Sequence, residues 1–199
     1  MKKALIIDSC IRGELSRTRR ILDSFLEALS PEYERIVLDL NKEKLSPHST
    51  ESLKKRDALI EKRQFEDPVF SYARQFSEAD LIVVAAPFWD LSFPAALKIY
   101  IEQVSVDGIT FHATETGLEG LCRAEKLIFI TTRGGFYHPG SGMEDMEMGS
   151  RYLKALHTFF GIRDYHLIAA DGLDIYGSDA EEIVKAASEE AARFAKTID

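Results

Sequence analysis

The sequence predicts an α/β protein built on a doubly wound, five-stranded parallel sheet with helices on both faces. Five short apolar runs recur along the chain, at residues 4–7, 35–40, 81–86, 126–132 and 165–170, and a segment with helical spacing follows each of them. Strands that alternate with helices form parallel sheets, and continuous apolar runs are typical of strands buried on both faces. The length of 199 residues suits one domain, so we expect residues 1–199 to form a single domain.

The first half of the chain carries two strands, two helices and a long excursion. Ser16 is placed to cap the first helix, whose apolar residues follow at helical spacing. After the strand at residues 35–40, residues 41–67 are rich in charge, and we expect a surface excursion with a helical piece near residues 51–63. A helix from about Pro68 to Ser77 then leads to the third strand.

The second half repeats the alternation with one interruption. Pro94 is suited to the start of the next helix. Residues 111–119 are expected to form a hairpin or an irregular loop. A helix is predicted from about Glu144 to Phe160, and Ser178 with Glu181 predicts a capping box for the last helix.

Composition excludes several classes of function. A net charge of −8 and a pI of about 5.2 argue against binding to nucleic acid, which depends on neutralising phosphates. No apolar stretch approaches the roughly 20 residues of a membrane helix, so we expect no membrane partner. The two cysteines, Cys10 and Cys122, are too far apart for a CxxC motif, and a reduced, cytoplasmic setting is the simplest interpretation. The histidines show no metal-ligand spacing, so we expect no metal.

Ligands of such sheets bind beyond the carboxyl ends of the strands, so three loops are of interest. The first, residues 8–18, contains Gly13 and several hydroxyl residues and runs into a helix N-terminus, where free N–H groups favour a phosphate. It has neither the GxGxxG nor the GxxxxGK[ST] pattern, which argues against a dinucleotide fold or an NTPase. Plain helix capping explains the same residues, so the loop alone leaves both readings open.

The other two loops suit a flat ring system. Residues 87–94 hold three aromatic side chains, including the single tryptophan of the chain. Residues 131–137 contain Gly134 and Gly135, which allow the backbone to approach a ligand closely. Each loop also has a structural explanation, as a loop folded onto the core or a tight turn, but all three lie at one sheet edge.

The stretches "SCIRGELSRT", "AAPFWDLSFPAALKIYIEQVSVDGITFHATETGLEGL" and "TTRGGFYHPG" resemble the FMN-dependent NAD(P)H:quinone oxidoreductases and azoreductases of the flavodoxin-like superfamily. The resemblance spans essentially the whole chain and implies a flavodoxin-like fold, bound FMN, NADH or NADPH as electron donor, a quinone or azo substrate, and a homodimer. It also assigns site residues. Those for the FMN phosphate are Ser9, Ser16, Arg17 and Thr18; those lining the isoalloxazine are Pro87, Phe88, Trp89, Asp90 and Leu91; those at its pyrimidine side are Thr132, Arg133, Gly134 and Gly135; and those of a substrate-facing wall are Phe111 and Phe159.

The resemblance has departures and a rival. Cys10 and Asp90 stand where azoreductases commonly have serine and asparagine, and a buried anion at Asp90 would disfavour negative charge on the flavin. Cys10 is expected to be a small buried residue and not a redox thiol. The implied reaction is a ping-pong, two-electron hydride transfer with no catalytic side chain required, although Tyr137 or His138 can be considered as a proton donor. The rival is a flavodoxin-type electron carrier that docks on protein partners.

Overall fold

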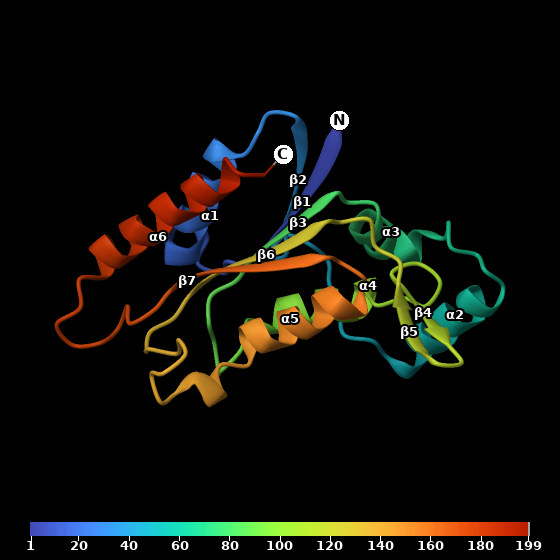
Figure 1. Cartoon of the computed structure of the whole chain (residues 1–199). Helices are drawn as coiled ribbons and strands as arrows, with labels where there is room; N and C mark the ends of the chain where they lie inside the picture. Colours follow the sequence, from blue (N-terminus) through green and yellow to red (C-terminus); the bar gives the residue numbers. More distant parts are fainter. Residues whose placement is uncertain (199) are drawn as a thin grey trace.

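A computed structural model, which describes residues 1–198, contains the predicted five-stranded parallel sheet. The strands are β1 (Lys2–Asp8), β2 (Tyr33–Asp39), β3 (Leu81–Ala85), β6 (Lys126–Thr132) and β7 (Asp164–Ala170). Their order in the sheet is β2-β1-β3-β6-β7, so the direction of winding changes between β1 and β3 (Figure 1). This change marks the edge at which a ligand site is expected.

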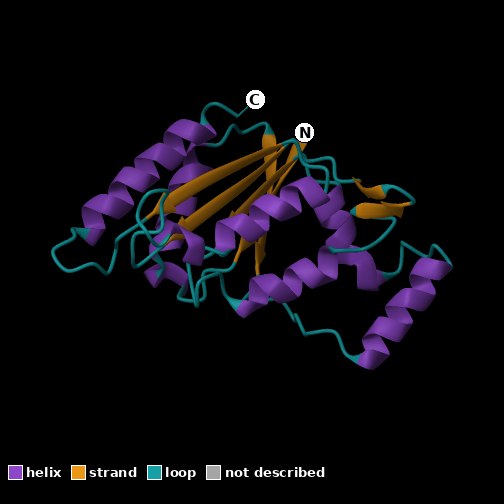
Figure 2. Ribbon diagram, turned by 60° about the horizontal axis from the view of Figure 1, so that its bottom comes forward, coloured by secondary structure: helices purple, strands orange, loops and turns teal. Residues whose placement is uncertain are grey.

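Helices cover both faces of the sheet (Figures 1 and 2). The helices α1 (Arg17–Ala28) and α6 (Ala180–Ala195) pack together on one face. The other face carries α3 (Ser71–Ser77), α4 (Ala95–Val104) and α5 (Gly149–Phe159), while α2 (Thr50–Glu61) lies in the excursion and buries none of its residues. A separate antiparallel hairpin is formed by β4 (Phe111–Thr114) and β5 (Gly117–Gly120). Short 3₁₀ turns complete the chain at Gly13–Leu15, Pro68–Phe70 and Glu144–Met146.

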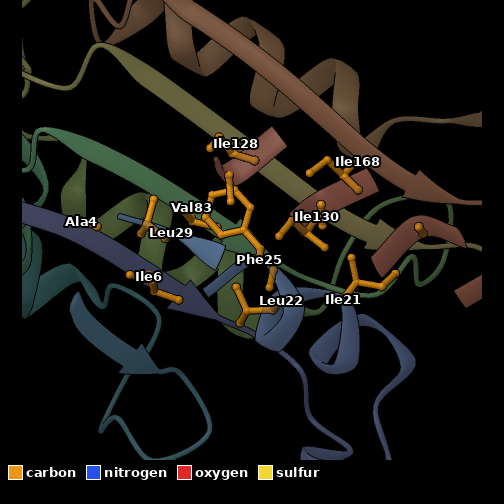
Figure 3. Packing of buried hydrophobic residues seen from close by; sticks show 14 of the residues in the cluster. Ala4, Ile6, Ile21, Leu22, Phe25, Leu29, Val83, Ile128, Ile130 and Ile168 are labelled. Atoms are coloured by element: carbon orange, nitrogen blue, oxygen red, sulfur yellow. The ribbon is translucent and has the colours of Figure 1, made fainter. Parts of the chain in front are cut away.

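The core divides into two layers because successive side chains of a strand point to opposite faces. Ile6, Val83 and Ile128 pack against Leu22 and Phe25 of α1 (Figure 3). The alternate residues of the same strands meet α3, α4 and α5 on the other face. This pattern explains why the strands read as continuous apolar runs, and it confirms the predicted fold class.

Two predicted helix starts are wrong. The fifth helix begins at Gly149 and not near Glu144, because the backbone at Glu147 is extended and brings its carboxylate back to accept hydrogen bonds from Ser150. The last helix is capped by Asp179 and not by Ser178. The Asp179 carboxylate accepts the N–H groups of both Glu181 and Glu182, and its charge is favoured at a helix N-terminus.

The hairpin lies at the end of the sheet opposite to the expected site. The segment that follows β5 is hydrogen-bonded to residues that shortly precede β7 and β3. The Cys122 N–H donates to the Phe160 carbonyl, and the Arg123 N–H donates to the Ser77 carbonyl. Gly120 and Gly161 touch so closely that a Cβ at Gly120 would lie 2.0 Å from the backbone nitrogen of Gly161. The hairpin is therefore fixed at the amino ends of β3, β6 and β7.

Candidate functional site

The first loop presents unused N–H groups at the start of α1. Ser16 is the N-cap, and its hydroxyl accepts the N–H of Arg19 at 3.3 Å, as predicted. Within residues 1–198, the N–H groups of Arg17 and Thr18 have no hydrogen-bond acceptor. The helix dipole adds partial positive charge at the same place. The geometry is therefore that of an anion site.

Beneath this loop lies an ion pair that sequence reasoning missed. Asp8 is buried at the end of β1, accepts the N–H of Cys10 at 2.9 Å and pairs with Arg19. Arg19 also bonds Asp23 at 2.9 Å, so its charge is engaged inside the protein. Cys10 is buried, and burial raises the pKa of its thiol, which agrees with a packing role.

The second loop turns sharply after Trp89. Trp89 and Ser92 exchange backbone hydrogen bonds of 3.1 and 2.8 Å, and Asp90 and Leu91 between them both have positive φ, 48° and 66°. This arrangement is that of a type I′ turn, which usually carries Asn or Gly. Trp89, Asp90 and Leu91 are all exposed, so the anion considered at Asp90 is not buried in this structure.

In the third loop the backbone carbonyls are hydrogen-bonded, whereas within residues 1–198 the N–H groups of the two glycines are not. The carbonyls of Arg133, Gly134 and Gly135 accept N–H groups of Leu173, Asp174 and Gly172 at 2.9 to 3.1 Å. In contrast, no acceptor in the described chain faces the N–H groups of Gly134 and Gly135. Two adjacent donors are thus available to a ligand.

The three loops enclose one pocket with an empty volume of about 590 Å³ that opens to solvent. Its lining includes the predicted residues Ser16, Arg17, Pro87, Phe88, Trp89, Thr132, Arg133 and Gly134. It also includes residues that sequence reasoning missed, namely Arg12, Leu15, Leu173 and Asp174. Arg12 stands in the same loop as the predicted hydroxyl residues, and Leu173 and Asp174 follow the last strand at the same edge. Their positions in these loops could therefore have indicated them as lining residues.

Comparison with known proteins identifies the family. A model of a family described as having a flavodoxin-like fold matches residues 2–195. The chain belongs to this family. An "FMN-dependent NADH:quinone oxidoreductase 2" of Clostridium acetobutylicum is 45% identical over 203 residues, covering 98% of this chain and 99% of the relative. An "FMN-dependent NADH:quinone oxidoreductase" of Clostridium perfringens is 42% identical over 200 residues with the same coverage.

Solved structures agree with this assignment. An azoreductase from Bacillus anthracis superposes on this flavodoxin-like protein with a TM-score of 0.87 at 29% identity, over 100% of both chains. An FMN-dependent NADH-azoreductase of the same species, solved in complex with FMN, has a TM-score of 0.84 at 24% identity over 98% of both chains and supports the fold. The predicted flavodoxin-like fold and family are therefore confirmed.

Several residues assigned by the resemblance turn inward in this flavodoxin-like protein. The Thr18 hydroxyl is buried and lies 2.7 Å from that of Thr132, which ties the first loop to the third. The Arg133 side chain is 3% exposed and lies between Glu147, at 3.5 Å, and Asp171, at 3.2 Å. The Ser9 hydroxyl is buried and has no partner within residues 1–198. Their side chains shape the loops, whereas the N–H groups of Arg17, Gly134 and Gly135 have no acceptor within residues 1–198.

The remaining predicted residues lie outside the pocket lining, and these include Ser9, Thr18, Asp90, Leu91 and Gly135. Tyr137 packs on Phe88 with ring centroids 4.6 Å apart, and exposed His138 bonds the carbonyl of Pro139. Phe111 and Phe159 contact each other, with centroids 4.5 Å apart, at the hairpin end of the sheet. The structure therefore does not bring this aromatic pair to the pocket of the same chain.

Residues 1–198 offer neither a metal-ion cluster nor a helix suited to span a membrane. They contain no group of three or more His, Cys, Asp or Glu placed to hold a metal ion. None of their helices combines the length and apolar character needed to cross a membrane.

Proposed function

We propose that this protein is an FMN-dependent NADH oxidoreductase that reduces quinones or azo compounds in the cytoplasm. The observation that carries the proposal is the pairing of two donor sets in one pocket. The N–H group of Arg17, together with the side chains of Arg12 and Arg17, suits a phosphate, and the N–H group of Gly134, with that of Gly135 next to it, suits ring carbonyls. Relatives at 42–45% identity over 98% of the chain carry this activity in their names.

The residues present fit FMN. Phe88 and Trp89 offer aromatic and apolar surface between the two donor sets, and the turn at Asp90 and Leu91 holds Trp89 at the mouth. Ser16 stabilises the helix start that points at the phosphate, and the bond between Thr18 and Thr132 fixes the distance between the phosphate end and the pyrimidine end. We assign Ser9 to the packing beneath the phosphate loop.

When bound, FMN supplies the redox chemistry, and the chain supplies binding, orientation and charge. Gly134 and Gly135 would direct N–H groups to the bound ring, and such donors would stabilise negative charge on it. The open mouth beside Trp89 accepts NADH and the electron acceptor in turn, which is a ping-pong order. Tyr137, which packs on Phe88, and His138 remain candidates for proton donation.

We further propose a homodimer. Phe111 and Phe159 lie at the opposite end of the sheet from the pocket, so they can form a substrate-facing wall only for the pocket of a second copy. Sedimentation equilibrium should give twice the chain mass. A Phe159→Ala variant should raise the KM for the acceptor several-fold and leave FMN affinity unchanged.

An absorption spectrum followed by anaerobic NADH addition tests the central proposal. The purified protein should show flavin bands that bleach with NADH, and steady-state NADH oxidation should depend on a quinone such as menadione. An FMN-loaded protein without this turnover would favour the electron-carrier alternative. A protein that neither contains nor takes up FMN would contradict the proposal.

A further inference from the structure

The pocket contains an anion of its own. Asp174, in the loop between β7 and α6, pairs with Arg17 through an oxygen 2.9 Å from the guanidinium nitrogen. Its other carboxylate oxygen lies 2.6 Å from the position that a Cβ on Gly134 would occupy. The carboxylate therefore lies between the phosphate end of the pocket and its pyrimidine end.

The pair between Asp174 and Arg17 matters for ligand binding because few other cations in the pocket are available to a ligand. Three arginines line it, and the side chain of Arg133 is already neutralised by Glu147 and Asp171. Arg12 has no ion-pair partner in the described part of the chain, which leaves Arg12 and Arg17 to face a ligand. A phosphate monoester carries a charge of about −1.5 to −2 at pH 7. Two arginines match this charge only if Asp174 no longer pairs with Arg17.

We propose that Asp174 competes with the FMN phosphate for Arg17 and so sets the affinity for the cofactor. This inference rests on the proposed function and assigns a residue that the resemblance did not assign. The Asp174 side chain is 68% exposed and its backbone N–H is held by the Gly134 carbonyl, so rotation of the side chain releases Arg17 without movement of the loop.

Replacement of Asp174 by asparagine tests the inference. Asp174→Asn removes the charge at nearly constant size, and the Kd for FMN, measured on flavin-free protein through the fluorescence of Trp89 and of the flavin, should fall about five-fold. This factor corresponds to an exposed ion pair. Riboflavin lacks the phosphate, so its Kd should stay the same. Inorganic phosphate should compete with FMN about five-fold more strongly in the variant.

A matched control exists on the same helix. Arg20 pairs with Glu181 at 2.8 Å with similar exposure, 45% and 73%, but neither residue lines the pocket. Glu181 also acts electrostatically on Arg17 but lies outside the pocket lining, so Glu181→Gln should change the Kd for FMN much less than Asp174→Asn does and should leave the Kd for riboflavin unchanged. An unchanged or higher Kd for FMN in Asp174→Asn would overturn the inference, because Asp174 would then be neutral to binding or would orient Arg17 for it. Failure of both variants and of the parent protein to bind FMN would instead refute the proposed function.

Discussion

Leu91 adopts a backbone conformation that leucine rarely takes. Its φ of 66° places it in the left-handed region, where a Cβ costs about 1–2 kcal/mol. Leu91→Gly removes this cost, and the greater freedom of glycine in the unfolded chain offsets part of the gain. We expect the free energy of unfolding to rise by about 0.5–1 kcal/mol, measured by denaturant titration. Leu91→Ala keeps the Cβ and should show no gain in the free energy of unfolding. A lower free energy of unfolding in Leu91→Gly would contradict the proposed backbone strain at Leu91.

Single residues show where sequence reasoning stops. The cap at Ser16 and the presence of Gly134 in the pocket lining were predictable because a helix start and a glycine in a strand-end loop are local properties. The destinations of the Thr18 and Arg133 side chains were not, since their partners Thr132, Glu147 and Asp171 are distant in sequence. A residue type indicates what a side chain can bind, and only the fold decides which partner it meets.

At the scale of elements, the start of α5 depends on Glu147. This buried carboxylate accepts the Ser150 N–H at 2.9 Å and lies beside Arg133. Glu147→Ala uncaps the helix and removes one of two counter-charges from a buried arginine, which costs about 3 kcal/mol. Thermal or denaturant unfolding checks this value. Asp145→Ala removes an exposed pair with Arg151 nearby and should cost under about 0.5 kcal/mol. Equal losses in the two variants would rule out the proposed role.

The packing of α6 on β7 should depend on pH through His166. The ring stacks on Phe194 with centroids 3.6 Å apart, and burial lowers the pKa of His166, with Lys126 acting in the same direction and Glu190 opposing it. The unfolded chain therefore binds the proton more readily, near pH 6.5. Stability from this packing is complete above that pH and falls as the pH drops below it.

A His166→Phe variant tests this dependence because it keeps the stack and removes the titration. Its unfolding free energy should fall less between pH 7 and pH 5 than that of the parent protein. His138→Phe, which changes an exposed histidine, is the control for the replacement of a histidine by phenylalanine. Parallel pH profiles for the parent and His166→Phe would argue against a titrating His166.

Helix boundaries also depend on contacts with residues distant in sequence, which limits their prediction from the sequence. The strands were predicted within a few residues because their apolar runs and burial fix them, and α2 was predicted within a few residues although it buries none of its residues. The start of α5 was not, since the break depends on Arg133 attracting Glu147 from another loop. The cap of α6 was displaced by one residue because Ser178 and Asp179 are both good caps and only the helix start at Ala180 separates them.

At the scale of the whole molecule, the pocket is assembled from loops that lie up to about 160 positions apart. Arg12 and Asp174 line the same pocket, as do residues after β3 and β6. The alternation of strands and helices was enough to place the loops after β1, β3 and β6 at one edge. The loop after β7 was overlooked, although a parallel fifth strand brings its end to the same edge.

This assembly predicts that cofactor binding stabilises the whole fold. Global unfolding separates the loops, so FMN binds the native state and stabilises it by about 2.7 kcal/mol at 100 times its Kd. For a protein of this size, that corresponds to a rise in Tm of about 5–10 °C. Scanning calorimetry across a series of FMN concentrations should show Tm rising with the logarithm of concentration. Arg17→Ala, which weakens the phosphate end, should require more FMN for the same shift. If spectroscopy shows that flavin is bound but the Tm does not change with FMN concentration, the cofactor binds outside these loops.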